Sequence, residues 1–224
     1  MTQQWIRSNA AKVRLDAETL DKLGRIRGLS PIASDVLDAL GWNTAIPGGV
    51  IAARTGPHRH SVVGHAITMA YLPEQSMAHA PGRYPLKSGL AHEQAFSYAS
   101  PSDVLVIDAR GLLNASVMGG TAAKMAVKAG LGGVVVDGAV RDIEDIRESG
   151  LSVWSRSLTA ATGKLRIEAA AINYPVLCCG VTVCPGDLII ADQSAVCVIP
   201  NAVIHEAVTR ILALAREDGR AGLG

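Results

Sequence analysis

The segment GLGGVVVDGAVRDIEDIRESG, residues 130–150, joins an apolar run to a cluster of charged residues. A short run of small and β-branched residues is typical of a buried strand, and the charges follow where the chain leaves the sheet. Arg141 offers a planar fork for a carboxylate or carbonyl oxygen, and Asp142 is a hard oxygen ligand suited to Mg²⁺ or Mn²⁺. The pair therefore predicts a site for a metal ion and an anion. The alternative is an Arg–Asp pair that ties down a turn, followed by Glu144 and Asp145 in the first turn of a helix, where acidic residues are favoured.

A glycine pair precedes a predicted helix in the segment MGGTAAK, residues 118–124. The N–H groups of Gly120, Thr121 and Ala122 have no acceptor inside such a helix and point outward at its positive end, which favours a bound carboxylate or phosphate. The alternative is that Gly119 and Gly120 only turn the chain. In a βαβ unit, however, the loops after successive parallel strands lie at the same edge of the sheet. We therefore expect this loop and the charged strand exit to face one crevice.

The composition indicates one globular domain over residues 1–224 and excludes several classes of protein. The chain is 49% apolar and 18% charged, with only 4% aromatic residues, so small aliphatic residues must build the core of an α/β fold. With 21 basic and 20 acidic residues and no basic stripe, it is not expected to bind nucleic acid. The polar N-terminus lacks the apolar core of a signal peptide, and no run approaches the roughly 18 residues of a membrane span. We expect a cytoplasmic protein.

Local patterns place the elements that must position these residues. Helical patterns run over 16–41 and over 202–217. In the first range, Asp16 is a predicted N-cap, Gly28 ends a first helix and a second helix begins near Ala33. The segment 73–90 has the prolines and glycines of a long surface loop, and 110–120 is predicted to be a glycine-bounded loop after the strand DVLVIDA. One strand–loop–helix–strand unit followed by short turn-linked strands predicts a sheet with both parallel and antiparallel pairs.

Several other residues that could ligate metal have simpler interpretations. The four cysteines, at 178, 179, 184 and 197, lie among aliphatic residues and are predicted to be buried free thiols. His58 and His60 are two positions apart on a polar connection and are expected to be solvated. Acidic residues at predicted strand ends are expected to cap turns; these are Asp103, Asp137, Asp187 and Asp192.

The motif VVVDGAVRDIED, with a glycine 22 residues before Arg141, resembles the class II pyruvate aldolases that cleave 4-hydroxy-4-methyl-2-oxoglutarate and 4-carboxy-4-hydroxy-2-oxoadipate, a family related to the regulator of ribonuclease E activity. Further blocks that resemble the family follow in order along most of the chain: GLSPIASDVLDALG, GHAITM, PSDVLVIDARG and YPVLCCGVTVCPGDLIIADQSAVCVIP. The resemblance implies a swivelling β/β/α fold, assembled as homotrimers or homohexamers with sites between subunits.

The resemblance also implies a role for each site residue. Asp142 is the direct ligand of Mg²⁺ or Mn²⁺, Arg141 holds the keto-acid oxygen, and the Gly119–Gly120 loop with the N–H groups of Thr121 and Ala122 holds the pyruvate carboxylate. Aldolases of the family carry an acid that helps to order the metal-bound waters where this chain has Gly120. Gly120→Asp is therefore expected to raise pyruvate release from oxaloacetate, provided that the loop keeps its backbone shape. A further family acid comes from the C-terminal helix of a neighbouring subunit, and here Glu217 matches it best, with Asp218 as the alternative.

Two classes of function follow. The first is a metal-dependent lyase that releases pyruvate from a 4-hydroxy-2-oxo diacid; oxaloacetate decarboxylation also fits, because it gives the same pyruvate enolate. Gly120 and the long 73–90 loop leave room for a hydratase or tautomerase of a related oxo acid. The second class is a non-catalytic, protein-binding regulator, and the retained Arg141–Asp142 pair favours the enzyme. A methyltransferase lacks a convincing cofactor-binding glycine motif.

Overall fold

The computed structural model describes residues 13–46, 51–52, 61–74 and 90–220. Within these residues, nine strands form one mixed sheet, in the order β1-β11-β10-β3-β4-β5-β6-β2 with β7 paired to β3, and β8 and β9 form a separate hairpin. The strands are β1 (Ala45–Ile46), β2 (Ile51–Ala52), β3 (Val62–Pro73), β4 (Val104–Met118), β5 (Gly133–Val140), β6 (Ser152–Leu158), β7 (Ile167–Ile172), β8 (Val176–Cys178), β9 (Val181–Val183), β10 (Leu188–Ala191) and β11 (Val196–Ile199).

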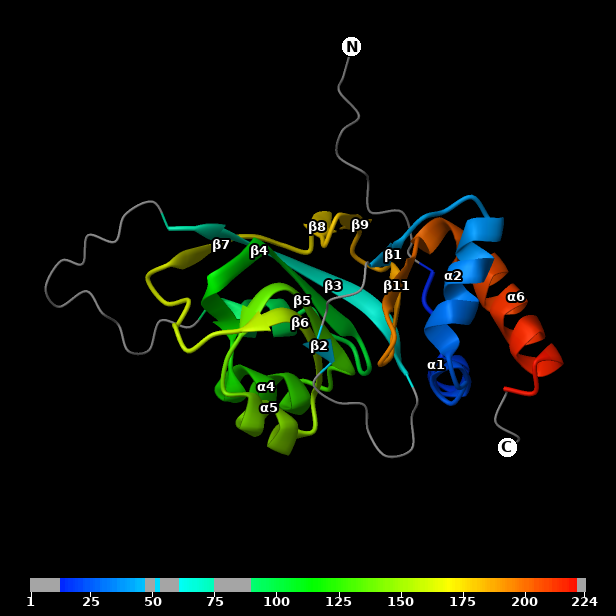
Figure 1. Ribbon diagram of the computed structural model, residues 1–224, viewed down its shortest axis with the longest axis horizontal. Helices are drawn as coiled ribbons and strands as arrows, with labels where there is room; N and C mark the ends of the chain where they lie inside the picture. The colour runs from blue at the N-terminus through cyan, green and yellow to red at the C-terminus, as the bar shows by residue number, and fades with distance from the viewer. Residues whose placement is uncertain (1–12, 47–50, 53–60, 75–89, 221–224) are drawn as a thin grey trace, which may run out of the picture.

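The centre of the sheet is parallel and its margins are antiparallel. β3, β4, β5 and β6 pair in parallel, while β10, β11, β1, β7 and β2 pair antiparallel. β5 is buried along its whole length, because helices cover one of its faces and the β8–β9 hairpin lies on the other side (Figure 1). The predicted α/β single domain with mixed strand directions is confirmed.

Helices lie in two groups (Figure 1). The first comprises α1 (Ala17–Gly24), α2 (Leu29–Ala39) and α6 (Ile204–Glu217), which follows a short 3-10 turn at Asn201–Val203. They bury an apolar cluster against β10, β11 and the start of β3. The second group, α3 (His92–Phe96), α4 (Gly120–Lys128) and α5 (Ile143–Ser149), packs on β3, β4 and β5. Both predicted helical regions, 16–41 and 202–217, are confirmed.

Helix α1 begins as predicted and ends earlier than predicted. The Asp16 side chain accepts a hydrogen bond of 2.7 Å from the N–H of Thr19, which confirms it as the N-cap. The helix stops at Gly24, and Gly28, at φ +63°, instead precedes α2. The expected start of the second helix near Ala33 is also wrong, because α2 begins four residues earlier.

The predicted loop at 110–120 is wrong. β4 continues to Met118 and pairs with β5 through register shifts at Leu112, Ser116 and Met118. Arg110 and Gly111 have φ of +56° and +69°, so they bend the strand without ending it. The last residues of β4 are buried, and burial of apolar side chains outweighs the local turn signal of Gly111.

The predicted loop 73–90 falls mainly on residues 75–89, which lie outside the described residues, as do His58 and His60. None of the described helices is long and apolar enough to span a bilayer.

Candidate active site

The two glycines of the MGGTAAK segment lie directly against the charged exit of β5. A Cβ atom on Gly119 would stand 2.5 Å from Oδ2 of Asp142 and 3.0 Å from Cγ of Arg141, which leaves no room for a side chain. The βαβ connection produces this contact, since β4 and β5 are parallel neighbours and α4 crosses between them. The predicted common crevice is therefore present.

Asp142 is held in an uncommon backbone conformation between strand and helix. It has φ +54° and ψ +50° and forms the N-cap of α5, whose first hydrogen bond runs from the N–H of Ile146 to its carbonyl. Aspartate is one of the few residues that tolerate this left-handed conformation. Its Oδ2 lies 3.5 Å from Nε of Arg141 and accepts a hydrogen bond of 3.4 Å from the N–H of Gly120. Both charged side chains stay more than a third exposed, so they can contact a ligand.

The N-terminus of α4 supplies unpaired donors beside these charges. The first helical hydrogen bond runs from the N–H of Ala123 to the carbonyl of Gly119, so the N–H groups of Gly120, Thr121 and Ala122 have no acceptor within the helix. Gly120 uses its N–H for Asp142. The N–H groups of Thr121 and Ala122 remain available for an anion, as predicted.

A cavity of about 430 Å³ opens on these groups. Gly119, Thr121 and Ala122 line it together with Arg141 and Asp142. The predicted substrate-binding residues thus surround one cavity, with the exception of Gly120, which does not line it. A second hollow of about 320 Å³ is also lined by Arg141 and Asp142, together with Glu144 and Leu158–Ala160.

Residues from two further segments line the larger cavity, and the sequence patterns did not single them out. Lys164 and Thr162 come from the connection between β6 and β7, and His92 comes from α3. Lys164 adds a second cation to a cavity that already holds Arg141. The sequence offers only an isolated lysine in a connection and an isolated histidine at the start of a five-residue helix, and neither pattern distinguishes a cavity wall from a solvated surface.

His92 forms a neutral part of the cavity wall. It is buried between Tyr71 and Phe96, and burial lowers its pKa to about 4, an effect that a hydrogen bond to the carbonyl of Val117 only partly opposes. Its Nε2 lies 3.5 Å from the Tyr71 hydroxyl, which itself donates to the carbonyl of Leu90. These contacts fix α3 against β3 and β4, and the imidazole carries no charge at neutral pH.

Gly120 faces Asp145 rather than open space. A Cβ atom there would lie 2.3 Å from Cβ of Asp145 and 2.9 Å from its Cγ. The Asp145 carboxylate is paired with Lys124, with Oδ1 3.3 Å from Nζ. The condition for a more active Gly120→Asp, that the loop keeps its backbone shape, is therefore not met, because Asp145 of α5 already fills that space.

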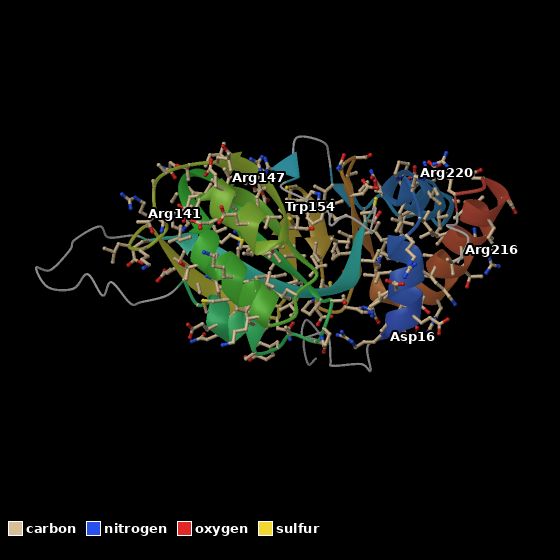
Figure 2. All side chains as sticks on the ribbon, turned by 90° about the horizontal axis from the view of Figure 1, so that it is seen from below. Asp16, Arg141, Arg147, Trp154, Arg216 and Arg220 are labelled. Atoms are coloured by element: carbon tan, nitrogen blue, oxygen red, sulfur yellow. The ribbon has the colours of Figure 1, made fainter. Side chains whose placement is uncertain are left out.

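Glu217 lies far from these residues within one chain. It is the last residue of α6, which packs on α2 at the opposite end of the molecule from α4 and α5 (Figure 1). Figure 2 shows the neighbouring Arg216 at one end and Arg141 at the other. Within the described part of the chain, no three His, Cys, Asp or Glu side chains converge as a metal site. Any metal here would depend mainly on the Asp142 carboxylate.

All four predicted turn-capping aspartates accept hydrogen bonds from backbone N–H groups at turns or helix starts. Asp103 accepts from the N–H of Ser100, Asp187 from those of Cys184 and Asn201, and Asp192 from those of Ser30, Ser194 and Ala195. Asp137 lies inside β5 rather than at its end, and its carboxylate accepts from the N–H of Cys179 in the β8–β9 turn and pairs with Arg156. Glu144 and Asp145 occupy the first turn of α5 as predicted. Three cysteines are buried free thiols, and Cys184 is partly exposed.

Residues 33–198 match the family described as RraA-like, Aldolase/RraA. The protein DlpA of Legionella pneumophila is 33% identical over 190 residues, which are 84% of this chain and 28% of that protein. The 4-hydroxy-4-methyl-2-oxoglutarate aldolase of Thermus thermophilus is 35% identical over 99 residues, 44% of this chain and 59% of that protein. The chain thus matches less than two thirds of either relative. The crystal structure of Streptomyces coelicolor RraAS2, described as an unusual member of the RNase ES inhibitor RraA family, superposes with a TM-score of 0.74 at 26% identity, over 92% of this chain and 96% of that one.

Proposed function

The chain belongs to the aldolase/RraA family, and from this premise we propose that it is a divalent-metal-dependent lyase that cleaves a C–C bond of a 4-hydroxy-2-oxo diacid and releases pyruvate. One observation carries the proposal. Arg141 and Asp142 meet the N-terminus of α4 at the wall of a single cavity, so a cation, a carboxylate and helix N–H donors converge on one small volume.

The residues present fit a weakly bound Mg²⁺ or Mn²⁺. Magnesium is commonly held by one or two carboxylates and otherwise by water, and Asp142 offers one partly exposed carboxylate at the cavity wall. A cation held there would supply a Lewis acid for the 2-oxo group of the substrate. Asp142 is the proposed direct ligand, and Arg141 stands beside it as a fixed positive charge.

Different protein groups bind different parts of the substrate. The N–H groups of Thr121 and Ala122 bind the carboxylate next to the 2-oxo group. Arg141 donates to the 2-oxo oxygen and stabilises the negative charge that develops there when the C–C bond breaks and pyruvate enolate forms. Lys164, at the same cavity, is suited to the second carboxylate, which favours a diacid over a monoacid. Oxaloacetate decarboxylation would use the same groups, because it also produces pyruvate enolate.

Glu217 can serve this site only from another copy of the chain, since α6 and α4 lie at opposite ends of one molecule. We propose a homotrimer or homohexamer in which the end of α6 from one subunit reaches the cavity of its neighbour. This part of the proposal rests on assembly and is tested separately from the chemistry.

A screen of substrates with and without metal tests the function. Purified protein is incubated with 4-hydroxy-4-methyl-2-oxoglutarate, 4-carboxy-4-hydroxy-2-oxoadipate and oxaloacetate, and pyruvate is measured with a coupled dehydrogenase. We expect release that depends on Mg²⁺ or Mn²⁺ and stops with a chelator.

The similarity to RraAS2 over nearly the whole chain favours a second candidate, a protein-binding regulator. No release from any of the three substrates, together with no heat of Mg²⁺ or Mn²⁺ binding, would favour that candidate.

A further inference from the structure

A second group of reactive side chains lies under the β8–β9 hairpin, on the side of the sheet away from α4 and α5 (Figure 1). It consists of Cys178, Cys179, Asp137 and Arg156, and is called the hairpin cluster. The N–H of Cys179 donates to Oδ2 of Asp137 at 2.7 Å, and Oδ1 of the same carboxylate lies 2.5 Å from Nε of Arg156. Arg156 therefore lies beside the carboxylate that holds the Cys179 backbone, and its interaction with the Cys179 thiol raises the pKa of Arg156.

The backbone of Cys179 is unusual for a cysteine. Cys179 and Gly180 form the two-residue turn between β8 and β9, with φ of +50° and +86°. A turn with both central residues at positive φ favours Asn-Gly or Asp-Gly, because these residues tolerate the left-handed region. A residue held in a sparsely populated conformation is a reason to look for a function of its side chain.

The surroundings of Cys179 favour its thiolate. The pKa of Cys179 is lowered first by a hydrogen bond from the Cys178 thiol and also by the hydrogen bond and charge of Arg156, against the opposing effects of burial and Asp137. The same contact and burial raise the pKa of Cys178, so Cys178 keeps its proton and acts as the donor. The other nearby charges are Asp108 and Arg110, which pair with each other at 3.7 Å.

The remaining cysteines provide a comparison within the same molecule. Cys197 is buried and its thiol donates to the carbonyl of Ser30; burial raises its pKa to about 12. Cys184 is the most exposed of the four. Accessibility alone therefore predicts that Cys184 reacts first, whereas thiolate stabilisation predicts Cys179, whose residue is 8% exposed beside a partly exposed Arg156.

We propose that Cys179 is a peroxide-reactive thiol and hence a site of reversible oxidative modification, separate from the cavity at Arg141 and Asp142. The thiolate sulfur attacks one oxygen of a hydroperoxide, the O–O bond breaks, and hydroxide or alkoxide leaves and takes a proton from water. The sulfur is oxidised to a sulfenic acid and the peroxide is reduced. Neighbouring Cα atoms lie about 3.8 Å apart, which is shorter than disulfides usually span, so Cys178 is a poor resolving partner. A low-molecular-weight thiol attacks the sulfenic acid instead, giving a mixed disulfide and water.

The first test is site selectivity in the intact protein. The protein is treated with hydrogen peroxide, sulfenic acid is trapped with dimedone, and labelled peptides are quantified by mass spectrometry. We expect the label at Cys179 ahead of Cys184, loss of that label in Cys179→Asn, which suits the turn, and no change in Cys184→Ser. Labelling of Cys184 before Cys179 would overturn the proposal.

The second test asks whether the charges set the reactivity. The rate of iodoacetamide alkylation at Cys179 is followed against pH in folded variants, checked by circular dichroism. Arg156→Gln should move the profile to higher pH and lower the rate at pH 7. Arg156→Lys should move the profile less, and Asp137→Asn should move it to lower pH. Shifts of the pH profile in opposite directions for Arg156→Gln and Asp137→Asn would not arise if the variants only loosened the hairpin. Identical profiles in all variants would contradict the proposed role of Arg156.

Discussion

The backbone N–H of Gly120 donates to Oδ2 of Asp142 across a sequence separation of 22 residues. This hydrogen bond joins the start of α4 to the end of β5, and it sets the Asp142 carboxylate beside the N–H groups of Thr121 and Ala122. The absence of a side chain on Gly119 permits the approach. The Arg141–Asp142 pair and the glycine pair therefore form one structural unit.

Asp142→Asn should abolish metal-dependent pyruvate release while the protein stays folded. The side chain is partly exposed and keeps an oxygen for the Gly120 N–H, but loses the charge that a divalent cation requires. Turnover and the heat of Mg²⁺ binding should fall together. Glu148→Gln, an exposed change on the same helix, is the matched control. Near-normal turnover of Asp142→Asn with added Mg²⁺ would remove Asp142 from the ligand role.

Arg141→Lys should lower kcat by more than about tenfold. A lysine supplies a point charge but not the planar fork that holds two oxygens, and such charged hydrogen bonds contribute about 1.5–3 kcal/mol. Steady-state kinetics against Arg147→Lys, on the exposed side of α5, measures the effect. If KM rises and kcat is unchanged, Arg141 binds the ground state only, and it does not stabilise the enolate.

Gly120→Asp should destabilise the protein rather than raise its activity. The new side chain would collide with Asp145, and overpacking of this kind costs about 1–3 kcal/mol, or several degrees in Tm. The double variant Gly120→Asp/Asp145→Gly should recover part of that Tm, because glycine at position 145 removes the Cβ, Cγ and Oδ2 atoms that the new side chain would meet. Thermal denaturation of both, with Asp145→Gly alone as the control for the glycine in α5, decides the point. If Gly120→Asp alone is as stable as the parent protein, α5 moves to make room for the new side chain at little cost in stability.

Glu217→Gln should lower kcat about tenfold or more while the oligomer persists, if the end of α6 serves a neighbouring cavity. Asp218→Asn, one residue further on, tests the alternative acid. Sedimentation establishes the assembly state of each variant at the assay concentration. A fully active monomer would show that each chain holds a complete site.

Stability should fall as the pH drops from about 6.5 to 4. Burial lowers the pKa of His92 from 6.5 to about 4, so the unfolded chain binds its proton first and acid favours unfolding. The difference corresponds to a loss of about 3 kcal/mol below pH 4. Burial also lowers the pKa of His65, whose Nε2 accepts from the N–H of Leu15, and this acts in the same direction.

Urea denaturation at several pH values measures this effect. His92→Gln should flatten the dependence between pH 6.5 and 4, whereas His205→Gln, at an exposed position on α6, should leave it unchanged. An unaltered slope in His92→Gln would show that His92 is already protonated in the folded state.

The sequence by itself determined the types of element and the chemistry of the Arg141–Asp142 pair. The apolar run before Asp137 has the composition of a buried strand, and the residues after Gly119 have the pattern of a helix, because burial and periodicity are local properties of the chain. The predicted crevice also followed, since the edge at which parallel strands end is fixed by the handedness of the βαβ unit. The loop predicted at 110–120 failed because pairing with β5 overrode a local glycine signal.

Contacts between segments distant in the sequence were decided only by the tertiary structure. Lys164 reaches the cavity from the β6–β7 connection and His92 from α3, and Asp145 fills the space beside Gly120. The pairing of β5 and β6 and the placement of the hairpin bring Arg156 and Cys179 to the same Asp137 carboxylate. No periodicity encodes such contacts, because they depend on strand register and on how far each connection carries the chain. A shift of one residue in a strand would have turned Asp137 away from the hairpin and left Cys179 without its charged neighbours.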